Sequence, residues 1–357
     1  MLVISRHITR ALLLVSLQCA IYATADPVYP ECMPGSTCFK LKPYSDRDWY
    51  FDCATVNTTA KESGNVIFLH GNDGARSKAM WSMMMQTFAA KGFKTLAFDQ
   101  RGFSPEASPY IQSQYNYNYL AEDLFAIADT FFGAGSKFHL VAHDQGARLG
   151  WHAIAIGTAR KRYLSYTPLS EAHSDAFSDS LFGPNADPKQ QKAFMYLWDF
   201  TLPGNSTTAY KNNLWRTLCT RAKHYATPRL CQPSLWWYIG AVESGNLAMQ
   251  PFSTWGLIGQ QIGIPEDYVK EHTVYPLSGR PQTTKVGNVT EFPVFYVCGA
   301  SDYADKCTNR FRDGTAKYVK DFHYYRSLKC GHDLVSKNCE DYQTVIDNIV
   351  HFVENAS

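Results

Sequence analysis

The sequence predicts an α/β protein with a mostly parallel sheet, helices on both faces and a mainly helical insertion. Apolar runs at 66–69, 94–98 and 138–142 suit buried strands, and segments with helical patterns separate them. This alternation stops near residue 169 and resumes near residue 292. Strands that alternate with helices favour a parallel sheet covered on both faces.

The first 25 residues have the pattern of a secretory signal peptide. Arg6, His7 and Arg10 precede an apolar run at 11–23, and Ala23-Thr24-Ala25 offers a small-x-small cleavage site. A single-span anchor is the alternative, but the run is short for a bilayer. We expect cleavage after residue 25, a secreted or secretory-pathway location and no stable membrane association.

Composition restricts the class of partner. The 357 residues carry a net charge of +2, with 45% hydrophobic and 18% charged residues, and no basic run follows the signal segment. We therefore expect a globular protein that acts on a small molecule and does not bind nucleic acid. Asn-x-Ser/Thr motifs, which mark glycosylation in exported proteins, occur at Asn57, Asn205, Asn288 and Asn355.

Cysteine usage agrees with export. Ten cysteines are present, and removal of the signal leaves nine, so disulfides are expected with at least one free thiol. Cys298 follows the apolar run at 294–297 and is our choice for the free thiol. Cys219 and Cys231 are expected to crosslink the insertion. The other six form an N-terminal and a C-terminal group of open connectivity: Cys32, Cys38 and Cys53, and Cys307, Cys330 and Cys339.

The chain divides into a core at 26–168 and 291–357 and a cap insertion at 169–290. Prolines and two cysteines at 26–47 predict an irregular lead-in before a strand near 49–51. Helices are expected in the core at 77–90, 118–132, 308–319 and near the C-terminus, with helix-like pieces of the cap at 189–200, 208–223 and 234–243. Further strands are expected at 163–166, 292–297 and 321–328.

Asp144 stands at a strand-to-helix junction. The buried strand at 138–142 leads into it, and a helix is predicted from Gly146. Ala142 and Gly146 flank it at two residues on each side, as a sharp turn that exposes one side chain requires. The helix N-terminus favours an ionised carboxylate there. An N-cap is the simpler interpretation of an Asp at this place.

Two further polar side chains follow later strands. Asp302 comes just after the strand at 292–298, and His332 comes just after the strand at 321–328. Three such residues at three strand ends favour a nucleophile, an acid and a base over a simple helix cap. Asp305 is the alternative acid.

Residues 64–168 and 290–353 resemble the α/β-hydrolase fold, in the branch with an Asp nucleophile: epoxide hydrolases and haloacid or haloalkane dehalogenases. The motifs are FLHGND (68–73), FDQRGFSP (98–105), LVAHDQGARLG (140–150), GASD (299–302) and CGHD (330–333). The resemblance implies that Asp144 is the nucleophile, Asp302 the acid and His332 the base. It also implies an oxyanion hole formed by the backbone N–H groups of Asn72 and Gln145.

The chain departs from the family pattern at several positions. Asp73 replaces a common proline, and Gln145 follows the nucleophile where epoxide hydrolases often have Trp. Arg148 matches an arginine that holds the carboxylate of haloacids. In the cap, Tyr196 and Tyr238 are the best matches to the paired tyrosines of epoxide hydrolases, and Trp198 weakly resembles a tryptophan that contacts halide.

The favoured function is epoxide hydrolysis to diols through a covalent ester on Asp144. Haloacid or haloalkane dehalogenation is the alternative, and a non-catalytic secreted binding protein on the same fold is another. Ester or lactone hydrolysis fits a carboxylate nucleophile less well. His139 and His143 are four apart in a strand, which is no metal clamp, and no phosphate loop is present, so we expect neither a metal nor a cofactor.

Overall fold

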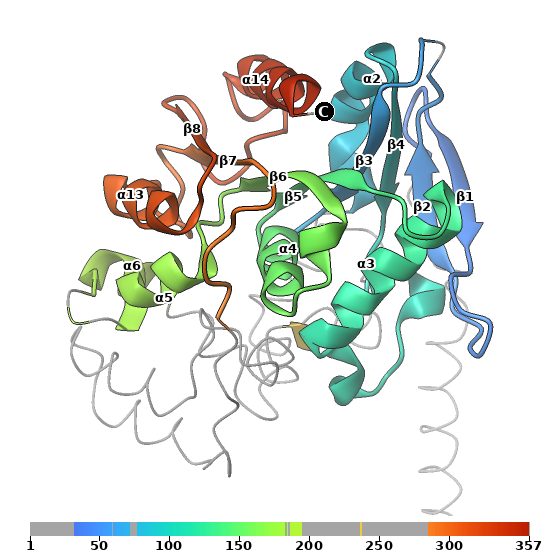
Figure 1. The fold of residues 1–357 in the computed structure, drawn as a ribbon, viewed down its shortest axis with the longest axis horizontal. Helices are drawn as coiled ribbons and strands as arrows, with labels where there is room; N and C mark the ends of the chain where they lie inside the picture. Colours follow the sequence, from blue (N-terminus) through green and yellow to red (C-terminus); the bar gives the residue numbers. More distant parts are fainter. Residues whose placement is uncertain are drawn as a thin grey trace, which may run out of the picture. The chain divides into compact units, whose positions relative to one another are not determined.

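The computed structural model describes residues 32–58, 60–71, 77–182, 184, 186–194, 236–237 and 285–356. Within these residues eight strands form one sheet in the order β1-β2-β4-β3-β5-β6-β7-β8 (Figure 1). They are β1 (Thr37–Leu41), β2 (Phe51–Thr55), β3 (Gly64–Leu69), β4 (Phe93–Phe98), β5 (Phe138–His143), β6 (Tyr163–Leu169), β7 (Val294–Gly299) and β8 (Phe322–Ser327). The pairs β1–β2 and β2–β4 are antiparallel and all other pairs are parallel, which confirms the predicted sheet.

Helices cover both faces of the sheet, as predicted (Figure 1). Helices α2 (Ser82–Ala90) and α14 (Tyr342–Asn355) lie on one face, and α3 (Tyr117–Phe132) and α4 (Gln145–Ala155) lie on the other. Strand β3 shows why: Val66 and Phe68 belong to the core shared with α2 and α14, and Ile67 and Leu69 to the core shared with α3 and α4. Alternate side chains of a strand point to opposite faces, so the apolar run at 66–69 needs cover on both sides.

The remaining described helices are shorter. Helices α5 (Ser174–Phe182), α6 (Pro188–Ala193) and α13 (Asn309–Tyr318) lie near one another, and the rings of Phe177 and Phe311 stack at 5.1 Å. Single 3₁₀ turns occur at η1 (Lys78–Trp81), η2 (Pro105–Ala107), η3 (Gln112–Tyr115) and η4 (Ala159–Lys161).

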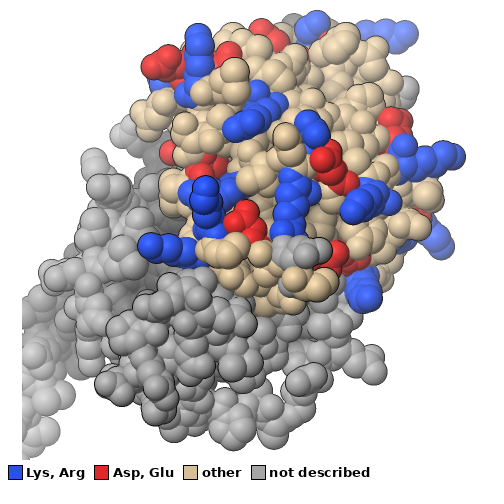
Figure 2. Space-filling model, turned by 90° about the vertical axis from the view of Figure 1, so that its left-hand side faces the viewer, with Lys and Arg blue, Asp and Glu red and all other residues tan. Residues whose placement is uncertain are grey.

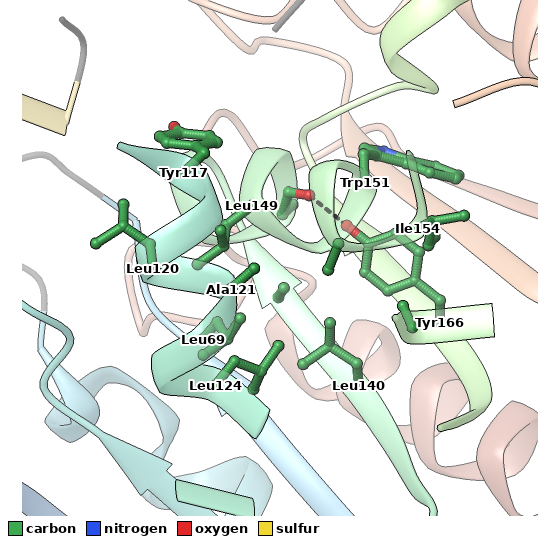
Figure 3. Close-up of a cluster of buried hydrophobic side chains, with 14 of the residues drawn as sticks. Leu69, Tyr117, Leu120, Ala121, Leu124, Leu140, Leu149, Trp151, Ile154 and Tyr166 are labelled. Carbon is green, nitrogen blue, oxygen red and sulfur yellow. Dashed lines mark hydrogen bonds between the residues drawn. The ribbon is translucent and has the colours of Figure 1, made fainter. Parts of the chain in front are cut away.

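One core layer fixes α4 on the sheet. Leu140 of β5, Leu124 of α3 and Leu149 of α4 pack together with less than 3% of each side chain exposed (Figure 3). Burial of such a side chain contributes about 1.5–3 kcal/mol. In the same layer the Tyr166 hydroxyl donates a 2.5 Å hydrogen bond to the carbonyl of Ala147. The start of α4 is therefore held against β6, and this matters because α4 begins directly after Asp144.

The predicted irregular lead-in at 26–47 is wrong for part of its length. Thr37–Leu41 forms β1, which pairs antiparallel with β2. Pro34 and Pro43 lie outside this strand, so neither removes a ladder hydrogen bond. The open edge of β2 supplies backbone partners that no local pattern reveals.

The predicted free thiol is also wrong. Cys298 is bridged to Cys307, and the free cysteine among the described residues is the buried Cys53. The loop after β7 turns back, which brings the Cα atoms of Cys298 and Cys307 to 5.5 Å, whereas Cys53 lies inside the sheet. The other described bridges are Cys32–Cys38 and Cys330–Cys339. Each bridge is local, so no crosslink joins the two groups, and Cys219 and Cys231 lie outside the described residues.

Little of the insertion belongs to the described part. Helices α5 and α6 open it, and Trp236 and Trp237 are buried against the core. The predicted helices at 208–223 and, apart from these two tryptophans, at 234–243 lie outside the described residues, and the core and cap boundaries stay a prediction. Among the described residues, no helix has the length and apolar character to cross a membrane.

Candidate active site

Asp144 lies in a strained turn between β5 and α4. It has φ 52° and ψ −125°, a backbone conformation that L-residues rarely adopt. Such strain persists where the surroundings enforce it and is frequent at functional residues. Gly146 permits the turn, because a Cβ atom there would lie 2.5 Å from the carbonyl oxygen of His70. The small residue in the motif therefore allows α4 to approach the end of β3.

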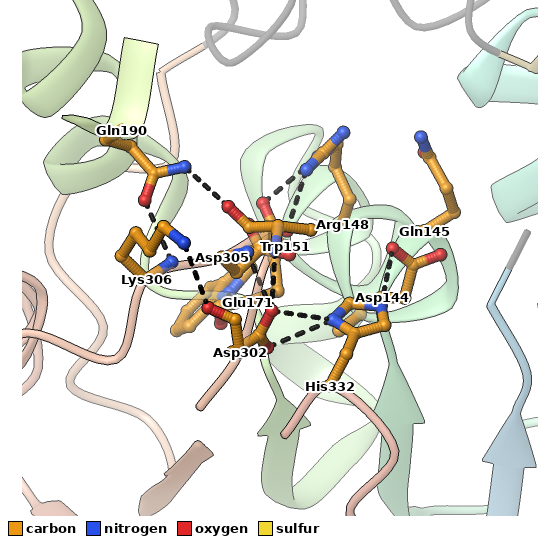
Figure 4. A network of polar contacts seen from close by, with 12 residues as sticks. Asp144, Gln145, Arg148, Trp151, Glu171, Gln190, Asp302, Asp305, Lys306 and His332 are labelled. Carbon is orange, nitrogen blue, oxygen red and sulfur yellow. Dashed lines mark hydrogen bonds and ion pairs between the residues drawn. The ribbon is translucent and has the colours of Figure 1, made fainter. Parts of the chain in front are cut away.

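His332 lies between two carboxylates (Figure 4). Its Nδ1 donates to Asp302, with 3.0 Å to Oδ2 and 3.1 Å to Oδ1, and its Nε2 is 3.4 Å from Oδ2 of Asp144. All three side chains are buried. The structure thus brings together three residues that are 158 and 30 positions apart in sequence (302 − 144 and 332 − 302).

Hydrogen bonds to the backbone fix the positions of both Asp302 and His332. Oδ1 of Asp302 accepts hydrogen bonds from the backbone N–H groups of Ala304 at 2.9 Å and Asp305 at 3.0 Å. The carbonyl of His332 accepts from Nε2 of His143 at 2.9 Å and from Ser170 Oγ at 3.3 Å. His143, which the sequence marked only as part of a motif, therefore positions the loop that carries His332.

The electrostatic setting of His332 favours its charged form. Burial opposes the imidazolium, but the charge of Asp302 and the hydrogen bonds to Asp144 and Asp302 outweigh burial and raise the pKa of His332 well above its ordinary value. Part of this increase in pKa comes from Asp144, so the proton affinity of His332 depends on the charge of Asp144.

Arg148 has an internal partner. Its Nε and Nη2 donate to the two carboxylate oxygens of Glu171 at 3.0 and 2.7 Å, and both side chains are at most 2% exposed. This bidentate pair anchors Arg148 inside the protein, and its expected contact with a substrate carboxylate stays a prediction. Glu171 was missed in the sequence, although its place just after β6 is the kind of position that drew attention to Asp302.

Asp305 is a second buried carboxyl close to His332. It is 1% exposed, and neither oxygen has a hydrogen-bond partner among the described residues. Burial first, then the charges of Glu171 and Asp302, raise the pKa of Asp305 well above its ordinary value. Because Asp302 contacts His332 and Asp305 does not bond it, the geometry favours Asp302 over Asp305 as the partner of the histidine.

Gln145 opens α4, and its Oε1 accepts a hydrogen bond from the hydroxyl of the buried Tyr117. The other expected site residues, Asn72, Tyr196, Trp198 and Tyr238, lie outside the described residues. Of the glycosylation motifs, Asn57, Asn288 and Asn355 are exposed, and Asn205 lies outside the described residues.

Asp144, Asp305 and His332 also form the one group, within the described ranges, whose geometry would suit a metal ion. One ligand atom from each lies within 4.8 Å of the others. Two carboxylates and an imidazole are a donor set that several divalent metals accept. His139 is not part of it: it contacts Ser165 at 2.8 Å, and burial lowers its pKa to about 4.

The arrangement suits nucleophilic chemistry. The carboxylate of Asp144, in the strained strand-to-helix turn, faces one nitrogen of His332, and Asp302 holds the other nitrogen. This is the arrangement of a nucleophile, a base and an orienting acid. A family model described as "Alpha/beta hydrolase family" matches residues 66–321, well over half of the chain. The chain belongs to the alpha/beta hydrolase family.

Curated relatives within this family are similar over short segments. Epoxide hydrolase 3 of Mus musculus is 37% identical over 87 residues, which is 24% of this chain and 22% of the mouse protein. Epoxide hydrolase B of Mycobacterium tuberculosis is 31% identical over 86 residues, 24% of this chain and 23% of that protein. The chain therefore aligns with less than a quarter of the length of either relative.

Solved structures of alpha/beta hydrolases share the fold over most of the chain. An epoxide hydrolase from metagenomes of hot environments has a TM-score of 0.64 at 19% identity, with 88% of this chain and 98% of that chain covered. An epoxide hydrolase of Vigna radiata has a TM-score of 0.58 at 18% identity, with 90% and 99% covered. At these identities the likeness establishes the fold, and it confirms the predicted α/β-hydrolase architecture.

Proposed function

We propose that this alpha/beta hydrolase is a secreted epoxide hydrolase that forms diols through a covalent ester on Asp144. The observation that carries the proposal is the contact of His332 with Asp302 on one side and Asp144 on the other. The relatives and structural neighbours that bear the name epoxide hydrolase support the choice of substrate class.

The first step is attack by Asp144 on an epoxide carbon. A carboxylate is a nucleophile without prior loss of a proton, unlike a serine hydroxyl. The new bond joins a carboxylate oxygen to carbon, and the broken C–O bond leaves an alkoxide that needs a proton donor. Tyr196 and Tyr238 of the cap are our proposed donors.

The second step is hydrolysis of the ester. His332 removes a proton from water, which attacks the ester carbonyl, and the N–H groups of Gln145 and Asn72 would stabilise the resulting oxyanion. Ester formation removes the charge of Asp144, which is one cause of the raised pKa of His332. The pKa of His332 therefore falls when the ester forms, so the histidine loses its proton more readily at the step that requires a base.

The pairing of Arg148 with Glu171 favours epoxides over haloacids. Glu171 engages two of the five N–H donors of Arg148 and offsets its charge, so a substrate carboxylate would be held less strongly than by an arginine without an acidic partner. We therefore retain dehalogenation only as an outcome of the test below.

The test is covalent trapping on a panel of epoxides and haloacids in heavy-oxygen water. With the wild type, label should enter the peptide that contains Asp144. His332→Gln should accumulate an ester adduct on Asp144, because attack does not need the base and release does. Asp144→Asn should form no adduct. Adducts from haloacids alone would replace our proposal with dehalogenase, and no label or adduct from folded protein would favour a binding protein.

Export is part of the proposal and has its own test. The signal-like segment, three local disulfides and the exposed Asn57, Asn288 and Asn355 support it. Expression in a eukaryotic host should give medium-borne protein that starts at Asp26 and loses mass after glycosidase treatment. Intracellular protein with an intact N-terminus would contradict export and leave the epoxide chemistry untouched.

A further inference from the structure

Asp305 takes no part in the two proposed steps, yet its carboxyl lies in an unusual environment. The carboxyl is buried beside Glu171, Asp302 and Arg148, and neither oxygen has a hydrogen-bond partner among the described residues. A buried carboxyl without a partner is costly and is seldom retained without a reason. Arg148, whose positive charge acts on Asp305, already forms a bidentate ion pair with Glu171.

The geometry around Asp305 suits one water molecule. One atom each of Asp144, Asp305 and His332 lies within 4.8 Å of the other two. A triangle with sides of that length has a point within about 2.8 Å of all three corners, which is the length of an O–H···O hydrogen bond. A buried water typically has two to four polar partners at such distances. The three partners here are the nucleophile, the base and Asp305.

We propose that Asp305 is a positioning residue that holds the hydrolytic water between His332 and the ester of Asp144. This inference rests on the proposed function and adds Asp305 to its second step.

The step balances with Asp305 unchanged. The water donates one hydrogen bond to His332 and another to an oxygen of Asp305. These two hydrogen bonds turn a lone pair of the water oxygen toward the ester carbonyl of Asp144. The C–O bond to water forms as the proton moves to His332. The ester C–O bond then breaks, and the departing alkoxide takes that proton to give the diol. Asp305 gains and loses no proton in this cycle.

The loop that carries Asp305 is held in place for such a role. Gln190 of α6 donates from its amide to the carbonyl of Ala304 at 2.8 Å, and its amide oxygen accepts from the N–H of Lys306 at 2.9 Å (Figure 4). The Cys298–Cys307 bridge closes the same loop. The raised pKa of Asp305 agrees with a neutral acid that can accept a hydrogen bond without adding a third negative charge beside Asp302 and Glu171.

The experiment separates the two chemical steps in single-turnover reactions with an epoxide that labels Asp144. Asp305→Asn keeps an acceptor oxygen, and Asp305→Leu has a similar size without one. We expect both variants to form the adduct within about threefold of the wild-type rate. Asp305→Asn should also hydrolyse it within about threefold, whereas Asp305→Leu should hydrolyse it at least about 100-fold more slowly, the scale of a positioned proton-transfer group. All reactions contain EDTA, and the wild type is also measured without it.

Each outcome decides between stated alternatives. Equal loss of both steps in Asp305→Leu would mean a structural role, and wild-type hydrolysis in that variant would mean no role, so either result overturns the inference. Loss of wild-type hydrolysis in EDTA would assign the three atoms to a metal ion instead. If Asp305→Leu does not fold, Asp305→Ala carries the same expectation. Absence of any adduct, even in His332→Gln, would overturn the proposed function as well, which distinguishes the two failures.

Discussion

At the scale of single residues, the charge of His332 is decided by its two neighbours. The charge of Asp302 is the largest of the causes that raise its pKa, and the hydrogen bond to Asp144 is the next. The order matters for the proposed reaction, because Asp144 loses its charge in the ester and Asp302 keeps its own. In the proposed reaction, His332 would thus be a base whose proton affinity changes within the catalytic cycle.

The pH dependence of ester hydrolysis tests this view. Hydrolysis needs neutral His332, so its rate should rise with pH and level off above the pKa of His332 in the ester. Asp302→Asn removes the main cause that raises this pKa, and the midpoint should therefore move to lower pH, whatever the loss in absolute rate. Adduct decay followed across a pH series measures the midpoint. Asp347→Asn, an exposed change on α14, is the control, and an unmoved midpoint in Asp302→Asn would contradict the assignment.

The raised pKa of Asp305 predicts how the free energy of unfolding depends on pH. Its pKa in the folded state lies well above the ordinary 3.8, so the folded state binds this proton more tightly than the unfolded state. The resulting stabilisation is complete below pH 3.8 and is lost as pH rises through the folded-state pKa, by up to about 1.4 kcal/mol per pH unit. Asp305→Asn lacks this loss. In urea titrations, the free energy of unfolding of Asp305→Asn relative to the wild type should rise from pH 4 to pH 7. A difference independent of pH would refute the raised pKa of Asp305.

At the scale of elements, the loop after β7 and the loop after β8 meet at Gly299. A Cβ atom on Gly299 would lie 2.1 Å from the carbonyl oxygen of Gly331 and 2.6 Å from that of Cys330. These residues immediately precede His332, so close backbone approach at the end of β7 sets the distance between the histidine and Asp302.

Gly299→Ala should therefore disturb both stability and activity. The overpacked contact should lower the free energy of unfolding by about 1–3 kcal/mol, and displacement of the His332 loop should reduce ester hydrolysis more than ester formation. Gly331→Ala is the matched control, since its Cβ would meet Ser301 at an ordinary 3.4 Å. Similar losses in the two variants would show that the Gly299 contact is not what places His332.

At the scale of the whole chain, two disulfides close the loops that carry the acid and the base. Cys298–Cys307 encloses Asp302, and Cys330–Cys339 encloses His332. Each bridge spans nine positions, and closure of a loop of this size stabilises a fold by about 2–3 kcal/mol in the chain-entropy account. Export to an oxidising compartment would thus also order the proposed active site.

Replacement of both Cys330 and Cys339 by Ala should lower the free energy of unfolding by about 2–3 kcal/mol and slow ester hydrolysis, since the His332 loop gains freedom. Denaturant titration and single-turnover kinetics measure the two effects. In the wild type, alkylation without reductant should modify Cys53 only after unfolding, and alkylation of Cys298 would contradict the pairing described here. Disulfide formation between Cys219 and Cys231 stays a prediction for the same peptide map.

One face of the described residues mixes charges of both signs. On the face shown in Figure 2, Lys and Arg side chains are interspersed with Asp and Glu, in keeping with a net charge of +2. This distribution agrees with the small-molecule substrate that the composition predicts.

The sequence by itself determined the order of strands and helices, the elbow at Asp144 and the strand ends that carry Asp302 and His332, because all of these follow from local periodicity and from small residues at turns. It did not determine β1, the Cys298–Cys307 bridge or the pairing of Arg148 with Glu171. Those depend on which segments meet after folding: an open edge at β2, a loop that turns back, and a carboxyl buried beside α4. Only the tertiary structure decided that Asp302 contacts His332. It also decided that Asp305 lies beside them without a hydrogen-bond partner among the described residues. Burial and distance depend on the fold and not on the spacing of residues along the chain.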